Sequence, residues 1–408
     1  MLSVDEHLAR ALAAVEVLPA RSVPLAQALD RVLAQDVVSD GPLPRFTNSS
    51  MDGYAVRVAD VATASQEHPV RLAVSADLPA GPGVPARLAA GTAARIMTGA
   101  PAPEGTEAVV PVEWTDAGVT EVEIRRPASP GLYVRGPGED VQAGELVLRR
   151  GARLSPRQIA LLAAVGHAEV LVHPQPRVVV LSTGSELVPP GQRLGFGQIY
   201  DSNGYGLAAA AAELGASVRQ AGPVSDDEDA VLAALHEAVD GADLVISSGG
   251  VSAGAYDPVK AVLRTLGTVR FDKVAMQPGM PQGFGTLGAA GTPIFTLPGN
   301  PVSAMVSFEI FVRPALRKLS GESSLHRHAV HARAGVGWTS PGGKRQFVRA
   351  LLERASDGAW EVVPVGGQGS HLVADLAEAT CLAVVPEAVT EVQPGDELRC
   401  LLLDRARR

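Results

Sequence analysis

The sequence has only two cysteines, Cys381 and Cys400, and no Cys-x-x-Cys pair. This argues against a disulfide framework and fits a reducing compartment. No run approaches the ~18 consecutive apolar residues that a membrane-spanning helix needs. The N-terminus carries Asp5 and Glu6 where an export signal would have basic residues. We therefore expect a soluble cytoplasmic protein with no membrane partner.

Positive charge is scarce as well. The 35 Lys and Arg residues are outnumbered by 44 Asp and Glu, which gives a formal net charge of −9. Such a balance provides no electrostatic support for binding nucleic acid. The chain has no Gly-x-x-x-x-Gly-Lys-Ser/Thr string, which excludes a P-loop enzyme by motif, and its nine histidines show no zinc spacing.

The chain is long enough for several domains, with 408 residues of which 46% are hydrophobic. Helical patterns near the N-terminus, including a short helix expected over 25–33, and after Ser155 flank a stretch of short β-rich runs and Pro/Gly turns. This arrangement indicates a β-rich domain inserted into a discontinuous helical one. The expected domains are 1–45 with 139–174, the insertion 46–138, an α/β domain 175–325, and a C-terminal β-barrel 326–408, for which a sandwich is the alternative.

Strand and helix patterns alternate through the α/β domain. Apolar strands are expected at 178–181, 218–221, 244–247 and 293–297, and a long amphipathic helix over 301–319. Alternation of this kind is typical of a doubly wound parallel sheet. The predicted fold class is therefore multi-domain α/β.

Three loops follow expected strands at the edge where open parallel sheets bind ligands. They combine glycines, which let backbone N–H groups approach a ligand, with hydroxyl groups or a helix amino end. Each alone is also compatible with an ordinary βα turn, but three at one edge favour a site for a phosphate-bearing ligand. The candidate residues, from loops 182–187, 247–254 and 297–303, are Thr183, Gly184, Ser248, Gly249, Gly250, Ser252, Pro298, Gly299, Asn300 and Pro301.

Carboxylates gather in and beside the same loops. Acidic side chains next to bound phosphates usually hold a hard cation such as Mg²⁺. Any one of them alone also suits a helix cap or a turn, as Asp226 and Asp227 do. We expect Mg²⁺ as the cofactor, with candidate ligands Glu186, Asp201, Asp226, Asp227 and Asp257.

Long and uncommon strings across essentially the whole chain resemble the molybdopterin molybdenumtransferases, relatives of the E domain of gephyrin. Examples are Asn-Ser-Ser-Met-Asp-Gly-Tyr-Ala at 48–55 and Leu-Pro-Gly-Asn-Pro-Val-Ser at 297–303, and further matches lie at 96–101, 138–140, 182–186, 199–203, 248–252 and 274–281. The resemblance implies an elongated four-domain subunit and a homodimer. It also implies insertion of molybdate into adenylylated molybdopterin with release of AMP, the final general step of molybdenum cofactor biosynthesis.

The resemblance further implies roles for individual residues, with a site that lies between two subunits. Matching positions place Glu186, Asp226 and Asp257 in the main site, lined by Lys273, Pro298 and Pro301; Asp52 and Thr98 face the α/β domain of the other subunit; and Arg345 and Ser370 match functional positions in the C-terminal domain.

One stretch departs from the family pattern. Where the family often has two lysines, this chain has Gln277 and Met280. A charge-assisted contact is worth about 1.5–3 kcal/mol, so each loss predicts roughly ten- to hundredfold weaker anion binding. Three explanations are open: Arg345, Lys344 or Lys260 compensates; the chain is a paralogue with different oxyanion use; or those lysines contribute less than their charge suggests.

Two other functions remain as alternatives. The first is another nucleotide or pterin phosphoanhydride enzyme on the same fold, and the second is a non-catalytic scaffold. The Met-Asp-Gly-Tyr region at 51–54 argues against the first, because single-domain relatives with the Ser-Gly-Gly loop lack it. The complete set of carboxylates argues against the second, because a scaffold has no need of metal-binding acids.

Overall fold

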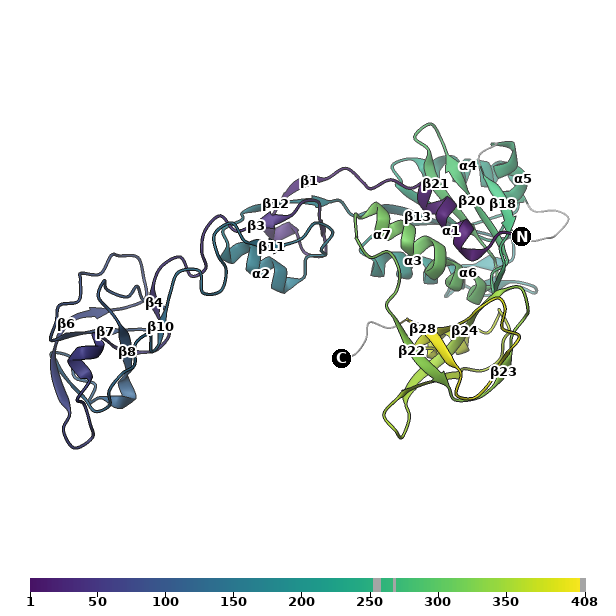
Figure 1. Ribbon diagram of the computed structural model, residues 1–408. Helices are drawn as coiled ribbons and strands as arrows, with labels where there is room; N and C mark the ends of the chain where they lie inside the picture. The colour runs from purple at the N-terminus through teal and green to yellow at the C-terminus, as the bar shows by residue number, and fades with distance from the viewer. Residues whose placement is uncertain (252–257, 267–268, 404–408) are drawn as a thin grey trace.

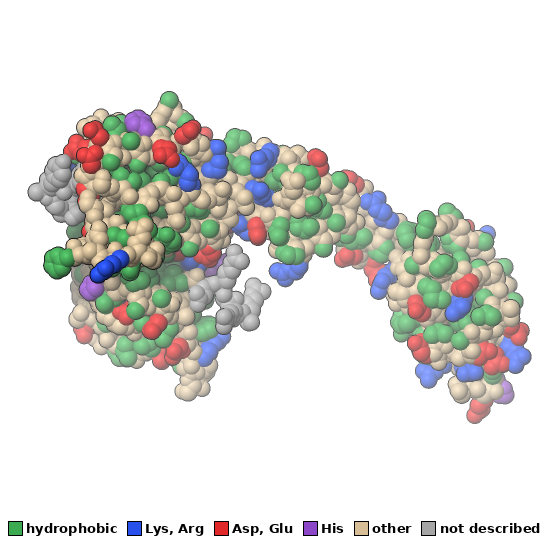
Figure 2. Space-filling view, turned by 180° about the vertical axis from the view of Figure 1, so that it is seen from behind, with side chains coloured by type: hydrophobic (Ala, Val, Ile, Leu, Met, Phe, Trp, Pro, Cys, Tyr) green, Lys and Arg blue, Asp and Glu red, His purple; other side chains and the backbone are tan. Residues whose placement is uncertain are grey.

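The computed structural model describes residues 1–251, 258–266 and 269–403. The molecule is elongated (Figure 1). An α/β domain with a small barrel beside it forms one end, a slender junction domain lies in the middle, and a β-rich distal lobe forms the other end (Figure 2). The multi-domain α/β fold class is therefore confirmed. Within the described ranges, no helix is long and apolar enough to cross a membrane.

The α/β domain contains a six-stranded sheet in the order β16-β13-β17-β21-β20-β18. The first four strands run parallel, which confirms the doubly wound sheet, whereas β20 is antiparallel to both of its neighbours. The chain order reverses beside β13, so that strands on either side of it connect in opposite directions along the sheet. The bounds are β13 (Arg177–Thr183), β16 (Ser217–Val224), β17 (Leu244–Ser248), β18 (Arg270–Lys273), β20 (Pro281–Leu287) and β21 (Thr292–Leu297).

Helices cover both faces of this sheet. Successive side chains of a strand point to opposite faces, and in β13 Val178 and Val180 join one core while Val179 and Leu181 join the other. Continuous apolar strands therefore suit a sheet that is buried on both sides. The helices α1 (Val4–Ala13) and α3 (Ser202–Glu213) contribute to the first core, and α4 (Glu228–Val239) and α5 (Pro258–Thr265) to the second.

The helix predicted over 301–319 is present, but a π-helical turn interrupts it. It consists of α6 (Pro301–Ser307), the π turn η4 (Phe308–Val312) and α7 (Arg313–Leu319). Pro314 has no N–H to donate, and its ring crowds the preceding turn, which a locally wider helix relieves. The turn buries an ion pair between Glu309 and Arg313, with Oε2 and Nε 2.5 Å apart.

The junction domain is built from strands on both sides of the insertion. β1 (Arg21–Pro24) pairs with β12 (Glu169–His173), which also pairs with β2 (Val32–Leu33). The helix predicted over 25–33 is wrong: a 3₁₀ turn, η1 (Leu25–Gln27), forms instead, and Asp30 at φ 60° turns the chain into β2. The domain also contains α2 (Pro156–Ala164) and the pair β3 (Val37–Val38) and β11 (Leu146–Leu148).

The first helix does not pack in the junction domain. The buried residues Val4 and Ala11 of α1 belong to the core of the α/β domain, whereas Val23 and Leu33 belong to the junction core. Residues 1–45 therefore divide between two hydrophobic cores. The periodicity of a helix shows which of its faces is apolar but not which domain will cover that face.

The distal lobe contains a five-stranded sheet in the order β8-β5-β7-β6-β9, with a hydrophobic core on each face. The insertion is thus β-rich, as predicted. The short pair β4 (Asn48–Ser49) and β10 (Val134–Arg135) lies where the chain enters and leaves it. The sheet strands are β5 (Gly53–Val56), β6 (Val70–Leu78), β7 (Thr92–Ile96), β8 (Ala108–Pro111) and β9 (Glu121–Ile124), and the 3₁₀ turns are η2 (Val58–Val61) and η3 (Val112–Trp114).

The C-terminal domain is a closed five-stranded barrel, as predicted. The order is β24-β25-β22-β28-β26, and β26 pairs back to β24. Beside β24 lies β19 (Met276–Gln277), a strand from the α/β segment. The other elements are β22 (Ala329–Ala334), β23 (Trp338–Thr339), β24 (Arg345–Arg354), β25 (Trp360–Pro364), α8 (Val373–Glu378), β26 (Cys381–Val385), β27 (Glu391–Val392) and β28 (Glu397–Leu402).

Candidate functional site

The carboxyl ends of the parallel strands meet where the order of the sheet reverses. Ser248 of β17 lies opposite Ser182 of β13 on one side and Leu297 of β21 on the other. The loops that follow these three strands therefore start at the same level. Open α/β sheets bind ligands at such a reversal, and the structure brings the described parts of all three predicted loops, 182–187, 247–251 and 297–303, to this edge.

The glycines of the second loop allow the loops to pack closely. Gly249 has φ 95° and Gly250 has φ 78°, in the region that favours glycine. The Gly249 N–H donates to the Leu297 carbonyl at 3.1 Å. A Cβ on Gly249 would lie 2.8 Å from the carbonyl oxygen of Thr183, so no larger residue fits there. The predicted site residues Ser252 and Asp257 lie outside the described residues.

Asn203, at the start of α3, ties two of the loops together. Its Nδ2 donates to Ser248 Oγ and to the Gly299 carbonyl, both at 2.7 Å. Its Oδ1 is shielded from solvent and has no hydrogen-bond partner in the described structure. We did not predict this residue as part of the site; its one sequence signal was a place at the end of the family-like string 199–203.

Two of the predicted acids lie at the turn after β13: Glu186 belongs to this turn, and Asp226, which follows β16, is hydrogen-bonded to it. The Ser185 N–H donates to Asp226 Oδ2, and the Asp226 N–H donates to Ser185 Oγ, each at 3.0 Å. The carboxylate of Glu186 lies over Gly184, because a Cβ there would be 2.7 Å from Glu186 Oε2. Glu186 and Asp226 are both exposed, so this end of the edge presents negative charge to solvent.

Two other candidate metal ligands cap helices. Asp201 Oδ1 accepts from the Gly204 N–H at 2.8 Å, and Asp227 Oδ1 accepts from the Ala230 N–H at 2.9 Å. Of the adjacent pair Asp226 and Asp227, it is therefore Asp226 that contacts the loop after β13. Among the described residues, no three His, Cys, Asp or Glu side chains are grouped to hold a metal ion.

The barrel reaches the third loop through Ser370. Asn300 does not cap α6 with its side chain; its Nδ2 donates to Ser370 Oγ at 2.9 Å. The Val302 N–H donates to the Ser370 carbonyl at 3.1 Å. Because Pro301 has no N–H and Val302 is engaged, the amino end of α6 offers fewer free donors than we expected. The predicted residues Ser370, Asn300 and Pro301 are nonetheless brought together.

Lys273 and the departure from the family pattern lie at the same edge. β18 runs in the direction of β21 and ends at Lys273, whose side chain is exposed. Gln277 pairs with Gln346 of the barrel in register. Of the cations considered as compensation, Lys260 lies with its Nζ 5.5 Å from the centroid of the Phe271 ring.

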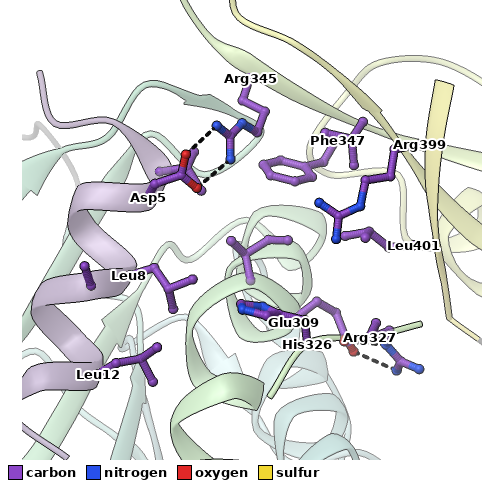
Figure 3. Close-up of a pocket in the computed structure, with 14 residues that line it drawn as sticks. Asp5, Leu8, Leu12, Glu309, His326, Arg327, Arg345, Phe347, Arg399 and Leu401 are labelled. Atoms are coloured by element: carbon purple, nitrogen blue, oxygen red, sulfur yellow. Dashed lines mark hydrogen bonds and ion pairs between the residues drawn. The ribbon is translucent and has the colours of Figure 1, made fainter. Parts of the chain in front are cut away.

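Arg345 makes its contacts away from the loops. Its guanidinium donates to both carboxylate oxygens of Asp5 at 2.9 and 2.8 Å and lies 3.0 Å from Glu387. The hydrogen bond with Asp5 raises the pKa of Arg345 and lowers that of Asp5. Figure 3 shows this pair beside a cavity of about 320 Å³ between α1 and the barrel. In the described structure Arg345 thus fastens α1 to the barrel.

The remaining predicted residues lie in the distal lobe. The N–H and the Oγ1 of Thr98 both donate to Asp52 Oδ1 at 2.7 Å, and these bonds lower the pKa of the exposed Asp52. Asp52 immediately precedes β5, which pairs with β7 and β8. Figure 1 shows these two strands at the opposite end of the molecule from β13. A single chain therefore does not bring Asp52 and Thr98 to the edge of the α/β sheet.

Known proteins match this chain over nearly its whole length. Three family models match: the MoeA N-terminal region (domain I and II) at 2–166, the probable molybdopterin binding domain at 179–318, and the MoeA C-terminal region (domain IV) at 331–403. Molybdopterin molybdenumtransferase 2 of Mycobacterium tuberculosis is 48% identical, covering 98% of this chain and 99% of its own. The molybdopterin molybdenumtransferase of Haemophilus influenzae is 39% identical over 91% of both chains. The crystal structure of the molybdopterin biosynthesis MoeA protein from Pyrococcus horikosii has a TM-score of 0.82 and 35% identity, covering 99% of each chain.

Proposed function

The chain belongs to the MoeA family of molybdopterin molybdenumtransferases, and we propose that it inserts molybdate into the dithiolene of adenylylated molybdopterin with release of AMP. Family membership supports a transferase role in molybdenum cofactor biosynthesis. The observation that supports the specific substrate is the convergence of three loops at the switch point of the sheet, joined by Asn203.

The proposed substrate suits the arrangement of the loops. A pterin joined to AMP through a pyrophosphate needs room for phosphates at the centre and for a ring system at each end. The glycines at 249 and 250 allow close approach of the backbone, and Ser248 adds a hydroxyl group. We place the pyrophosphate at this edge of the sheet, with Thr183, Gly184, Pro298 and Gly299 bordering it.

The proposed reaction balances without an external oxidant or reductant. One water cleaves the phosphoanhydride and gives AMP and molybdopterin, each of which keeps one of the two phosphates. The two dithiolene sulfurs, entering as thiols, replace one oxygen of molybdate, which leaves with their protons as water. Mg²⁺ is the proposed cofactor, because it typically takes one or two carboxylates and completes its shell with phosphate oxygens and water. Glu186 and Asp226, with Asp257, would hold it; when bound it would neutralise charge on the phosphates.

We further propose that the active unit is a homodimer in which each edge is completed by the distal lobe of the second copy. Asp52 and Thr98 lie beside β5 and β7 of the distal lobe, and the separation of this lobe from the α/β domain within one chain supports this arrangement (Figure 1). We place the reaction in the cytoplasm, because the dithiolene thiols need a reducing compartment, and the free Cys381 and Cys400 are compatible with one.

The test is AMP release under anaerobic conditions from adenylylated molybdopterin, molybdate and Mg²⁺. We expect release that depends on molybdate and is lost in Asp226→Ala, because that change removes both a proposed metal ligand and the acceptor of the Ser185 N–H. The exposed Asp229→Ala, on the neighbouring helix turn, is the matched control and should retain activity. If the unmodified protein releases no AMP, the proposed transferase function is rejected. AMP release that does not depend on molybdate would favour another phosphoanhydride enzyme.

A further inference from the structure

A glycine-rich loop of the barrel, residues 366–371, lies against the amino end of α6. Ser370 in this loop accepts from Asn300 Nδ2 at 2.9 Å through its hydroxyl and from the Val302 N–H at 3.1 Å through its carbonyl. The third loop of the candidate site and this barrel loop are therefore one hydrogen-bonded unit. Anything that fixes residues 366–371 also fixes the position of Ser370 relative to Asn300.

Arg349 of β24 donates hydrogen bonds to the backbone of this loop. Its Nη1 donates to the carbonyls of Gly369 at 3.0 Å and Leu372 at 3.5 Å, and its Nη2 donates to the carbonyl of Gly367. The side chain is only 5% exposed. Burial lowers the pKa of Arg349, yet a guanidinium remains charged in proteins. A planar fork with several fixed donors is suited to gripping a loop by its carbonyls, which a lysine ammonium does not reproduce.

Asp375 of α8 contacts both the loop and Arg349. It lies 3.9 Å from the Arg349 guanidinium and accepts from the Gly367 N–H at 3.2 Å. Gly366 has φ 55°, and a Cβ there would lie 2.1 Å from Asp375 Oδ2. The loop is thus tightly built around two buried or half-buried charges, and it has no room for a side chain at residue 366.

Arg349 and the loop 366–371 lie beside the stretch where the sequence departs from the family pattern. Arg349, Gly367 and Gln368 line a small recess together with Gln277 and Pro278. Gln277 occupies one of the two positions where the family often has lysine. This recess therefore lies at the part of the site where the positive charge for an anion is reduced, which makes the placement of the remaining polar groups more important.

We infer that Arg349 is a positioning residue for molybdate binding, acting through the loop 366–371 and Ser370. This inference rests on the proposed function and adds a barrel residue that does not itself touch the substrate. Arg349 orients the Ser370 hydroxyl and the amino end of α6. Through Ser370, the barrel thereby helps to hold the amino end of α6.

The test compares steady-state AMP release by Arg349→Lys, Ser370→Ala and the double variant. We expect Arg349→Lys to raise the KM for molybdate about tenfold, the effect of one misplaced charge-assisted contact, with kcat and the KM for adenylylated molybdopterin within about twofold. Because both changes act through one loop, the double variant should be no worse than Ser370→Ala. Arg354→Lys, at the exposed end of the same strand where it stacks on Trp360, is the control and should match the unmodified protein.

A second variant covers the case in which Arg349→Lys does not fold. Gly366→Ala leaves Arg349 in place but displaces the loop from Asp375, and it should raise the molybdate KM in the same way. An unchanged molybdate KM in the folded variants, a fall in kcat alone, or effects of Arg349→Lys and Ser370→Ala that multiply would overturn the inference. Failure of the unmodified protein to release AMP would instead reject the proposed function itself.

Discussion

The edge of the α/β sheet and the Asp52–Thr98 pair of the distal lobe are built in opposite ways. At the edge, Asn203 joins loops that are far apart in sequence, with 45 residues to Ser248 and 96 to Gly299. In the distal lobe, both hydrogen bonds to Asp52 come from the one residue Thr98. The edge is formed by loops that follow several strands of one sheet, and the distal pair is an exposed local motif.

This difference suggests a division of tasks. A site assembled from several loops can select a large ligand by its shape, because the hydrogen-bond donors of the site come from several directions. An exposed carboxylate such as that of Asp52 does not by itself enclose a ligand. It can line a binding site only when another surface covers it, and in our proposal that surface is the edge of a second copy.

The largest effect is expected from Asn203→Leu. Leucine is similar in size but donates no hydrogen bond, so the loops after β17 and β21 lose the side chain that joins them. Two hydrogen bonds and the polar groups left unpaired predict about a hundredfold loss of kcat/KM in AMP release. Far-UV circular dichroism should be unchanged. Activity within twofold of the unmodified protein would show that the edge does not depend on this link.

Acid should weaken the α/β end before the distal lobe, through His7 of α1. His7 is 1% exposed, lies 4.8 Å from the Phe311 ring centroid, and has no hydrogen-bond partner among the described residues. Burial lowers its pKa to about 4 from 6.5. The unfolded chain therefore binds a proton at a higher pH than the folded chain does, and stability present above pH 6.5 is lost as the pH falls toward 4.

The measurement is the free energy of unfolding at several pH values for the unmodified protein and His7→Leu. The difference between their pH dependences should reach on the order of 3 kcal/mol between pH 7 and 4, following 1.36 kcal/mol per pKa unit. Asp5 titrates in both proteins and drops out of this difference. Parallel curves for the two proteins would contradict the account of His7.

Restoring the two family lysines tests the charge of the edge. In Gln277→Lys, Met280→Lys we expect the apparent KM for molybdate to fall by about tenfold, since one charge-assisted contact is worth about 1.5–3 kcal/mol. The gain should shrink at high ionic strength, because salt screens exposed charges. Lys273, already present at this edge, is left unchanged in the variant. An unaltered KM would mean that these lysines contribute less than their charge suggests.

The smallest effect is expected from Thr98→Val in the distal lobe. Thr98→Val removes the Oγ1 donor to Asp52 and leaves the backbone N–H donor in place. The pKa of Asp52 should therefore rise part of the way toward its ordinary value, and stability or activity that needs its charged form should be lost at a higher pH. Carbon-13 NMR titration of labelled aspartate carboxyls measures this shift. An unchanged Asp52 titration would show that the hydroxyl contributes nothing.

Local signals in the sequence predicted the loops of the edge. The turn conformation at Gly249 and Gly250 and the helix start at Pro301 depend mainly on residues that are close in the sequence. Long-range choices were not predictable in this way. The apolar face of α1 did not reveal that the α/β core would cover it, and the stretch containing β18 and β20 shows no clear alternation. Asn203 contacts residues 45 and 96 positions away in the sequence. Arg349 contacts residues 18 to 23 positions away. Only folding brings these partners together.

The site residues divide along the same line. Glu186 and Asp226 were predicted from their place beside strand ends, and both lie at the edge. Asp201 and Asp227 fitted the same rule but cap α3 and α4, since a carboxylate before a helix satisfies free N–H groups equally well. Arg345 was assigned by resemblance alone, and its side chain pairs with Asp5 of α1, a contact that no local pattern indicates.

The most direct test of a site shared between two copies mixes Asp52→Ala and Asp226→Ala, each of which we expect to be inactive alone, under conditions that exchange subunits. If each site combines the edge of one copy with the distal lobe of the other, a mixed dimer has one intact site and one that carries both changes. Random pairing of equal amounts then restores about a quarter of the unmodified AMP release. A mixture that exchanges subunits yet stays as inactive as either variant alone would contradict a site shared between two copies.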